Sequence, residues 1–168
     1  MKYYFILVIG SLMFLSCEIS VKKYDDRKQK PDSKIRNGIQ VRSSGVKLEQ
    51  AFLMNEDGTL IPEDNRIDVK QKVKLRLIAS GWKEKEDKVY LEAAQKVITS
   101  DGEVLYDQAN LFRKDSIESI NAEDAKYVTL TFWLNEIDKL FDYVTVEFRL
   151  WDKLGEGEIK GSYKLYLK

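Results

Sequence analysis

Histidine and cysteine, the residues most often used for nucleophilic catalysis and for binding transition metals, are almost absent from this chain. Its 168 residues include no His and a single Cys. Without His, a Ser-His-Asp triad, a Cys-His pair and a His₃ metal site are excluded. With one Cys, an intrachain disulfide and a Cys₄ zinc site are excluded. The chemistry that remains is that of carboxylates, cationic side chains and aromatic rings.

Carboxylates are abundant, with 28 Asp and Glu residues. A glycosidase needs two of them about 5–10 Å apart across a cleft, and calcium needs six to eight oxygen ligands. Nearly all of these acids stand beside Gly, Asn or Lys in segments typical of solvated turns. The groups Asn55, Asp57, Asp64 and Asp152, Glu156 lack the regular spacing of a calcium-binding loop. We therefore expect no catalytic pair, no metal and no cofactor.

A basic row is the sharpest charge pattern in the sequence. Lys70, Lys72, Lys74 and Arg76 occupy alternate positions, so on a strand they share one face at intervals of about 7 Å. Such a row could meet anionic lipid headgroups, polysaccharide or an acidic partner, or it could simply be a solvated or aggregation-resistant face. Lys and Arg together equal Asp and Glu at 28 each, which argues against a nucleic-acid-binding domain.

Aromatic side chains form the second candidate binding surface. They alternate with the apolar residues of segments 127–134 and 143–151, and so point away from the core. If these two segments pair directly, they create one outward aromatic face suited to a sugar, a peptide or a partner protein. If a Greek-key topology separates them, or a loop covers them, no such face forms. The residues of the predicted face are Tyr127, Trp133, Tyr143, Arg149 and Trp151.

The first sixteen residues have the composition of a secretory signal. Lys2 is their only charge, and Tyr3 to Leu15 is apolar apart from Gly10 and Ser11. This stretch is shorter than the roughly 20 apolar residues of a transmembrane helix. We therefore expect residues 1–16 to be a signal peptide.

The single cysteine stands at the end of this apolar stretch, in the sequence Phe14-Leu15-Ser16-Cys17. The motif resembles the lipobox of bacterial lipoproteins, although Phe14 replaces the commoner Leu. The resemblance implies cleavage before Cys17, acylation of its sulfur and anchoring in a membrane by several acyl chains, each CH₂ contributing about 0.8 kcal/mol. An ordinary secretory signal that happens to contain a Cys is the alternative.

Residues after the cysteine bear on the membrane and on the linker. Glu18, where lipoproteins retained in the inner membrane carry Asp, favours the outer membrane by resemblance. Segment 22–26, Lys-Lys-Tyr-Asp-Asp, is similar to the export tags of Bacteroidota surface lipoproteins, and a solvated linker is an equal alternative. Residues 17–45 are mostly charged and predict a flexible linker that holds the domain off the membrane, although a segment such as 39–41 could add to a sheet edge.

From Val46 to the last residue the dominant period is two, which is typical of half-buried strands. Apolar and polar residues alternate over about 46–54, 69–79, 89–97, 127–134, 143–151 and 163–167. No alternation of strand and helix is present. Residues 46–168 therefore predict an all-β, antiparallel sandwich that resembles the disulfide-free immunoglobulin-like domains of exported bacterial proteins. A small closed barrel is the alternative.

Short sequence segments also predict a turn, a loop and brief helical pieces between the strands. Asp101-Gly102 predicts a two-residue type I′ hairpin turn. Segment 136–141 could form a brief helix capped by Asn135, and segment 115–124 predicts a loop or a helical turn.

Together these features predict a non-enzymatic lipoprotein, lipid-anchored at the periplasmic face or the outer surface of the outer membrane. We expect it to act as a protein-interaction or accessory subunit of an envelope complex. A carbohydrate- or ligand-binding surface module is the alternative function.

Overall fold

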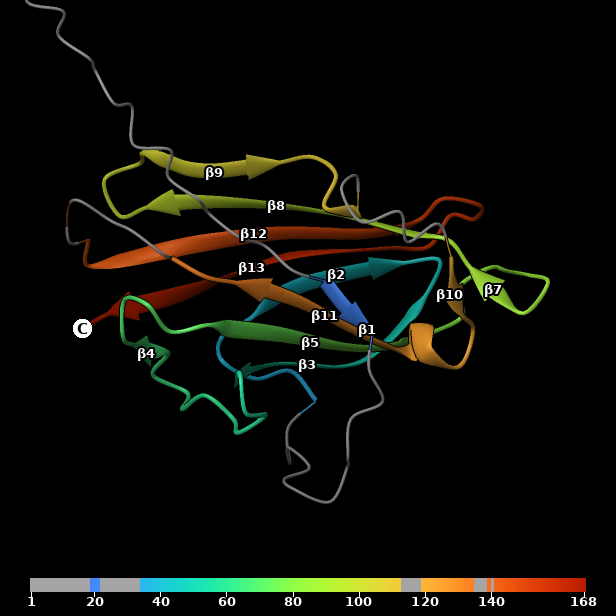
Figure 1. Cartoon of the computed structure of the whole chain (residues 1–168), viewed down its shortest axis with the longest axis horizontal. Helices are drawn as coiled ribbons and strands as arrows, with labels where there is room; N and C mark the ends of the chain where they lie inside the picture. Colours follow the sequence, from blue (N-terminus) through green and yellow to red (C-terminus); the bar gives the residue numbers. More distant parts are fainter. Residues whose placement is uncertain (1–18, 22–33, 113–118, 135–138, 140) are drawn as a thin grey trace, which may run out of the picture.

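The computed structural model describes residues 34–112, 119–134, 139 and 141–168, and the backbone of residues 19–21. Two antiparallel sheets pack face to face as a sandwich (Figure 1). The predicted all-β, antiparallel sandwich is thereby confirmed. Within the described residues, no helix is long and apolar enough to cross a membrane.

The smaller of the two main sheets, sheet A, has four antiparallel strands. In spatial order these are β1 (Ile19–Val21), β11 (Tyr127–Phe132), β5 (Val73–Ser80) and β3 (Lys47–Asn55). A β-bulge between Leu48 and Gln50 interrupts the register of β3 on β5. The outer edges of sheet A are therefore β1 and β3.

The larger sheet, sheet B, carries the longest strands. Its order is β2 (Gln40–Ser44), β13 (Glu158–Leu167), β12 (Tyr143–Asp152), β8 (Leu91–Thr99) and β9 (Val104–Gln108). The short strand β4 (Arg66–Ile67) adds in parallel to the end of β13. All other pairs in this sheet are antiparallel.

A third, small sheet lies at one end of the sandwich. It joins β6 (Glu84–Lys85), β7 (Lys88–Val89) and β10 (Ile120–Asn121). The 3₁₀ helix η2 (Asp124–Lys126) leads into β11. Of the segment 115–124, predicted as a loop or a helical turn, residues 115–118 lie outside the described residues and residues 120–121 form β10. The brief helix predicted at 136–141 falls largely outside the described residues.

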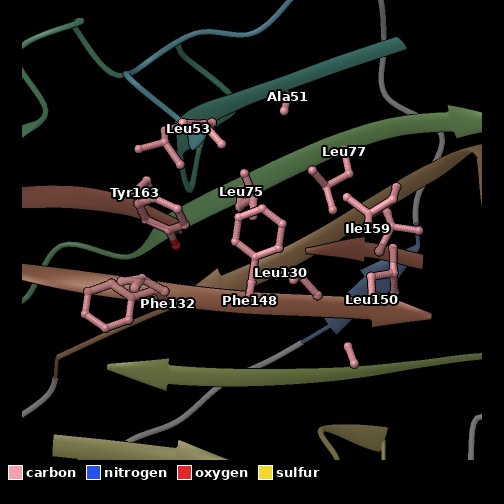
Figure 2. Packing of buried hydrophobic residues seen from close by; sticks show 14 of the residues in the cluster. Ala51, Leu53, Leu75, Leu77, Leu130, Phe132, Phe148, Leu150, Ile159 and Tyr163 are labelled. Carbon is pink, nitrogen blue, oxygen red and sulfur yellow. The ribbon is translucent and has the colours of Figure 1, made fainter. Parts of the chain in front are cut away.

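The core lies between the inner faces of sheets A and B. Leu53, Leu75 and Leu130 of sheet A face Phe148 and Ile159 of sheet B, and all five are buried (Figure 2). The alternation of apolar and polar residues read from the sequence is the alternation of inward and outward side chains in these strands. Burial of this apolar surface is the main force that holds the sheets together.

Part of the predicted linker belongs to the sandwich. Ile35 bridges to Ala51 of sheet A, and Ile39 is 6% exposed. Further along the chain, β2 pairs with β13 of sheet B, as expected from the prediction that segment 39–41 could add to a sheet edge. Residues 34–44 therefore cross from one sheet to the other, so the predicted boundary at 45 and 46 places the start of the domain too late.

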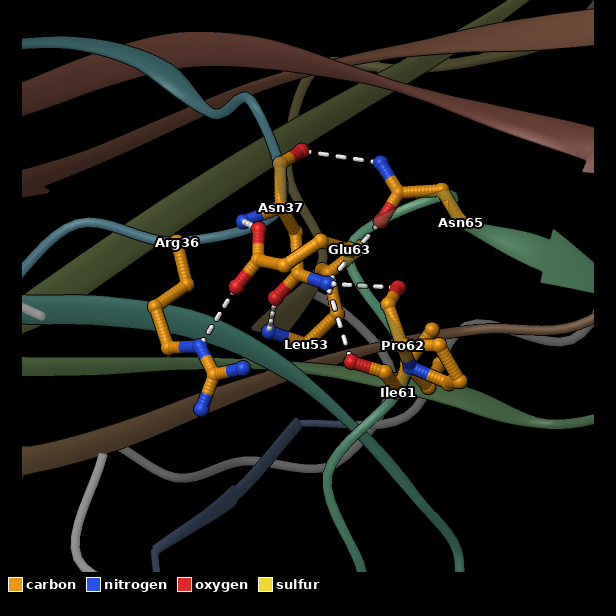
Figure 3. Close-up of polar contacts among 7 residues, drawn as sticks. All are labelled: Arg36, Asn37, Leu53, Ile61, Pro62, Glu63 and Asn65. Carbon is orange, nitrogen blue, oxygen red and sulfur yellow. Dashed lines mark hydrogen bonds and ion pairs between the residues drawn. The ribbon is translucent and has the colours of Figure 1, made fainter. Parts of the chain in front are cut away.

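A buried asparagine holds this crossing segment in place. The Nδ2 of Asn37 donates to the Oδ1 of Asn65 at 2.9 Å and to the carbonyl of Ile61 at 3.1 Å, and its Oδ1 accepts from the backbone N–H of Leu53 at 2.9 Å (Figure 3). Asn65 in turn donates to the carbonyls of Asn37 and Lys164, on the sheet B side. Both asparagines have positive φ, which Asn tolerates better than most residues.

The Asp101-Gly102 hairpin is present, but its turn is not the predicted type I′. Within this turn only Gly102 has a positive φ, and the N–H of Thr99 donates to the carbonyl of Glu103. This is a three-residue loop with Gly in the left-handed position, which is the next commonest hairpin connection. The adjacent positive φ values of a type I′ turn occur instead at Glu86 and Asp87, between β6 and β7.

Candidate binding surfaces

The predicted aromatic face is not assembled, because its two strands lie in different sheets. β11 pairs with β5 and β1, whereas β12 pairs with β13 and β8. Trp133 and Tyr127 therefore belong to sheet A, and Tyr143, Arg149 and Trp151 belong to the outer face of sheet B. The orientation of these side chains away from the core is correct, but the direct pairing of their strands is wrong.

Each of the four aromatic rings in that prediction has a cation of the same chain over it. Trp133 lies 4.9 Å from the Nζ of Lys72, and Tyr127 lies 5.9 Å from that of Lys126. On sheet B, Tyr143 lies 4.3 Å from the Nζ of Lys164 and Trp151 lies 4.6 Å from the guanidinium of Arg149. A sugar ring stacks on an open aromatic face, so these cation–π pairs disfavour a carbohydrate platform.

The predicted basic row is not a uniform exposed stripe. Lys70 is exposed, Lys72 and Lys74 are half-buried, and Arg76 is 5% exposed. Lys72 pairs with the carboxylate of Glu56 at 2.9 Å, and Lys74 donates to the carbonyl of the same residue at 2.9 Å. Only part of the row is therefore open to an anionic partner, because Arg76 is buried at one end and Lys72 is paired with Glu56, whereas Lys70 is exposed at the other end.

Arg76 lies among other buried side chains on the outer face of sheet A. Its direct neighbours across the sheet, Phe52 and Thr129, are also buried, as is Met54 beside Lys74. Arg76 donates from Nη1 to the carbonyl of Tyr127 at 3.2 Å. A partner therefore finds little free surface at the centre of this face.

The outer face of sheet B is open and carries a line of three cations. Arg42 of β2 lies opposite Lys160 of β13, which lies opposite Arg149 of β12. All three side chains are exposed, and Trp151 flanks Arg149. We call this line, Arg42–Lys160–Arg149, the cationic row. Like charges that face each other directly across strands destabilise a sheet, because their Cβ atoms are only about 5 Å apart.

Glu158 compensates two of the three cations. Its carboxylate accepts from the Nε of Arg149 at 2.6 Å and from the Nζ of Lys160 at 3.0 Å. The hydrogen bond from Lys160 and then that from Arg149 lower the pKa of Glu158. Arg42 forms no ion pair with any residue that the structure describes. The edge of the row at β2 is therefore left with an uncompensated positive charge.

A shallow hollow follows the cationic row. It has a volume of about 920 Å³ and opens onto β2, β13, β12 and β8. Gly161 lies at its floor, where a Cβ would approach the carbonyl oxygen of Gln40 to 2.2 Å, so a larger residue cannot occupy this position without moving β2. The side chains around the hollow include Gln40, Arg42, Lys96, Glu147, Arg149 and Lys160.

The acids considered as metal ligands have structural partners. Asp57 accepts from the hydroxyl and the N–H of Thr59 within a turn. Asp152 is buried and accepts from the N–H groups of Lys83, Leu154 and Gly155. Within the described part of the chain, no group of three or more acids or Cys is arranged to hold a metal ion.

Sequence reasoning missed two of the three members of the cationic row. Arg42 lay in the predicted linker, and Lys160 was not connected with Arg149 because strand register decides which residues face each other. Cys17, the predicted lipidation site, lies outside the described residues. Searches of protein-family models and of curated proteins found no match to this chain.

Proposed function

We propose that this protein is a non-enzymatic lipoprotein, anchored at the outer membrane through Cys17, that binds an acidic protein partner on the outer face of sheet B. In this role it acts as an accessory subunit of an envelope complex. The cationic row is the observation that carries the proposal. It places three cations in direct register on the more open of the two outer faces, and Glu158 compensates only two of them.

An acidic segment of a protein suits this surface better than a neutral ligand. Arg42 offers a guanidinium without an ion-pair partner among the described residues, and guanidinium binds carboxylates through two parallel hydrogen bonds. Trp151 beside Arg149 adds an aromatic ring of the kind that is enriched at protein interfaces. The hollow supplies a concave surface along which an extended segment can lie.

Charge reversal tests the partner site. The double variant Arg42→Glu, Lys160→Glu should lose a protein that co-purifies with the full chain from detergent-solubilised envelopes. The control variant Lys47→Glu, Lys85→Glu makes the same change of charge at exposed positions of sheet A and the β6–β7 hairpin, and should retain it. Equal recovery with both variants, or recovery of a monomer alone, contradicts the proposal. Glycan recovered in place of protein supports the alternative of a carbohydrate-binding module.

The anchor is tested separately. Mass spectrometry of the mature N-terminus should find an acylated Cys17, and the Cys17→Ala variant should leave the membrane fraction, because several acyl chains are needed for stable binding. An unmodified Cys17 contradicts the lipoprotein assignment. Protease treatment of intact cells then separates the outer surface, where the domain is cleaved, from the periplasmic face, where it is protected.

A further inference from the structure

Asn37, the residue that holds the crossing segment 34–44, is followed directly by Gly38. Among the Asn residues of the chain, it is the only one followed by Gly. Because glycine carries no Cβ, its backbone nitrogen can approach the side chain of the preceding residue closely. In an unfolded chain the backbone nitrogen of Gly38 can therefore reach the side-chain amide carbon, Cγ, of Asn37. This position is the one at which the sequence most favours deamidation.

The reaction at this position needs only water. The Gly38 nitrogen, having lost its proton to solvent, bonds to Cγ of Asn37. The bond from Cγ to Nδ2 breaks, and Nδ2 leaves as ammonia after taking up a proton that replaces the one lost. Water then opens the resulting cyclic imide at either carbonyl, which yields aspartate or isoaspartate. In the overall reaction one water is consumed and one ammonia is released, without any change of oxidation state.

The folded domain opposes this reaction at each step. Asn37 is 1% exposed, so the water that must open the imide is largely excluded. The departing Nδ2 donates to the carbonyls of Ile61 and Pro62 at 3.1 and 3.2 Å, and Oδ1 accepts from the N–H of Leu53 (Figure 3). Loss of the amide would leave these buried groups without partners. Deamidation therefore requires segment 34–44 to open first.

The product cannot restore these contacts. A carboxylate has no N–H to donate, so the two carbonyls and the Oδ1 of Asn65 would face a negative charge in place of a donor. Glu63 adds a second negative charge, because its Oε2 lies 2.6 Å from the backbone nitrogen of Asn37. Arg36 is already paired with that carboxylate at 2.6 Å. Burial of a further carboxylate among these oxygen atoms is strongly unfavourable.

We propose that Asn37–Gly38 is a deamidation site that the folded domain suppresses and that opening of segment 34–44 exposes. Once modified, the segment cannot close again, so the change acts in one direction only. β2 begins at Gln40, directly after this position, and carries Arg42. One covalent change therefore loosens both the connection between the sheets and the edge of the cationic row. The inference does not depend on the lipid anchor or on the protein partner.

Peptide mapping by mass spectrometry measures the reaction in the purified full chain, incubated at mildly alkaline pH in buffer and in urea. In urea, Asn37 should deamidate severalfold faster than Asn55 or the exposed Asn121, neither of which precedes Gly. In buffer, Asn37 should react at least about tenfold more slowly than in urea, because the reaction awaits local opening. Gly38→Ala should slow the reaction in urea, where its effect on the fold is irrelevant.

The Asn37→Asp variant carries the charge of the product and tests its effect on the fold. Amide hydrogen exchange in segment 34–44 should be severalfold faster than in wild type, whereas Asn121→Asp, the same change at an exposed position, should leave it unchanged.

Three results would overturn the proposal. The first is an equal rate of deamidation at Asn37 in buffer and in urea. The second is an equal rate at Asn37 and Asn121 in urea, which does not depend on whether any variant folds. The third is wild-type hydrogen exchange of segment 34–44 in the Asn37→Asp variant.

Discussion

The outer faces of the two sheets differ in what they leave for a partner. On sheet A the central side chains Phe52, Arg76 and Thr129 are buried, and Lys72 near its end is paired with Glu56. On sheet B the corresponding positions Arg42, Arg149 and Lys160 are exposed. The row of cations in one strand of the sequence is thus largely buried or paired. The row assembled from three strands is exposed, and its member Arg42 has no ion pair among the described residues.

The difference shows that exposure and cross-strand register, more than sequence spacing, decide which charges are available. Lys74 and Arg76 share a face, as their alternation predicts, but Arg76 is buried there and Lys74 is half-buried. Arg42 and Arg149 are more than one hundred residues apart and still belong to one row, because β13 lies between their strands. Substitutions can test this contrast, beginning with the segment 34–44 that connects the two sheets.

Removing the buried Asn37 from the connecting segment 34–44 should have the largest effect on stability. Asn37→Ala leaves the N–H of Leu53 and the carbonyl of Ile61 without their partner and forces Ala to a φ of 57°. We expect the free energy of unfolding to fall by about 2–4 kcal/mol, as measured by urea denaturation. The exposed Asn121→Ala variant is the control and should change it by less than about 0.5 kcal/mol. A similar small change for both would mean that residues 34–44 do not hold the sheets together.

Two arginine substitutions compare the faces directly. Arg76→Ala should lower the free energy of unfolding by about 1–3 kcal/mol, because it removes a buried side chain and its hydrogen bond to Tyr127. Arg42→Ala should change it by less than about 0.5 kcal/mol, because that side chain is exposed and has no ion pair among the described residues. Urea denaturation of both variants gives the comparison. A reversed order would contradict the distinction between a structural and a free cation.

The smallest expected effect is on the melting temperature at acid pH. The hydrogen bond from Arg36 and that from the backbone N–H of Asn37 lower the pKa of Glu63. The stabilisation is therefore complete above the ordinary Glu pKa and is lost as the pH falls through the lowered value. At pH 7 the wild type should melt at most about 2 °C above Glu63→Gln, because the Glu63 side chain is more than half exposed, and this gap should close as the pH falls below the lowered pKa. A gap that widens on acidification would contradict this linkage.

Much of the fold follows from the sequence, whereas little of the binding surface does. Alternation in 127–134 and 143–151 correctly predicts strands and their inward faces, but it cannot say which strands become neighbours. The N-terminal boundary was missed because Asn37, a polar residue in a charged segment, is fixed by side-chain hydrogen bonds that composition does not reveal. The turn at Glu86 and Asp87 likewise has no Gly or Asn to indicate it.

Site-specific photo-crosslinking in cells tests the central claim, that sheet B presents the partner site, most directly. A photoreactive phenylalanine analogue replaces Ser162, beside the cationic row on sheet B, or Gln50, on the outer face of sheet A. The account predicts a protein adduct from position 162 that disappears in the Arg42→Glu, Lys160→Glu background, and none from position 50. An adduct from position 50 alone, or one from position 162 that survives the charge reversal, would contradict it.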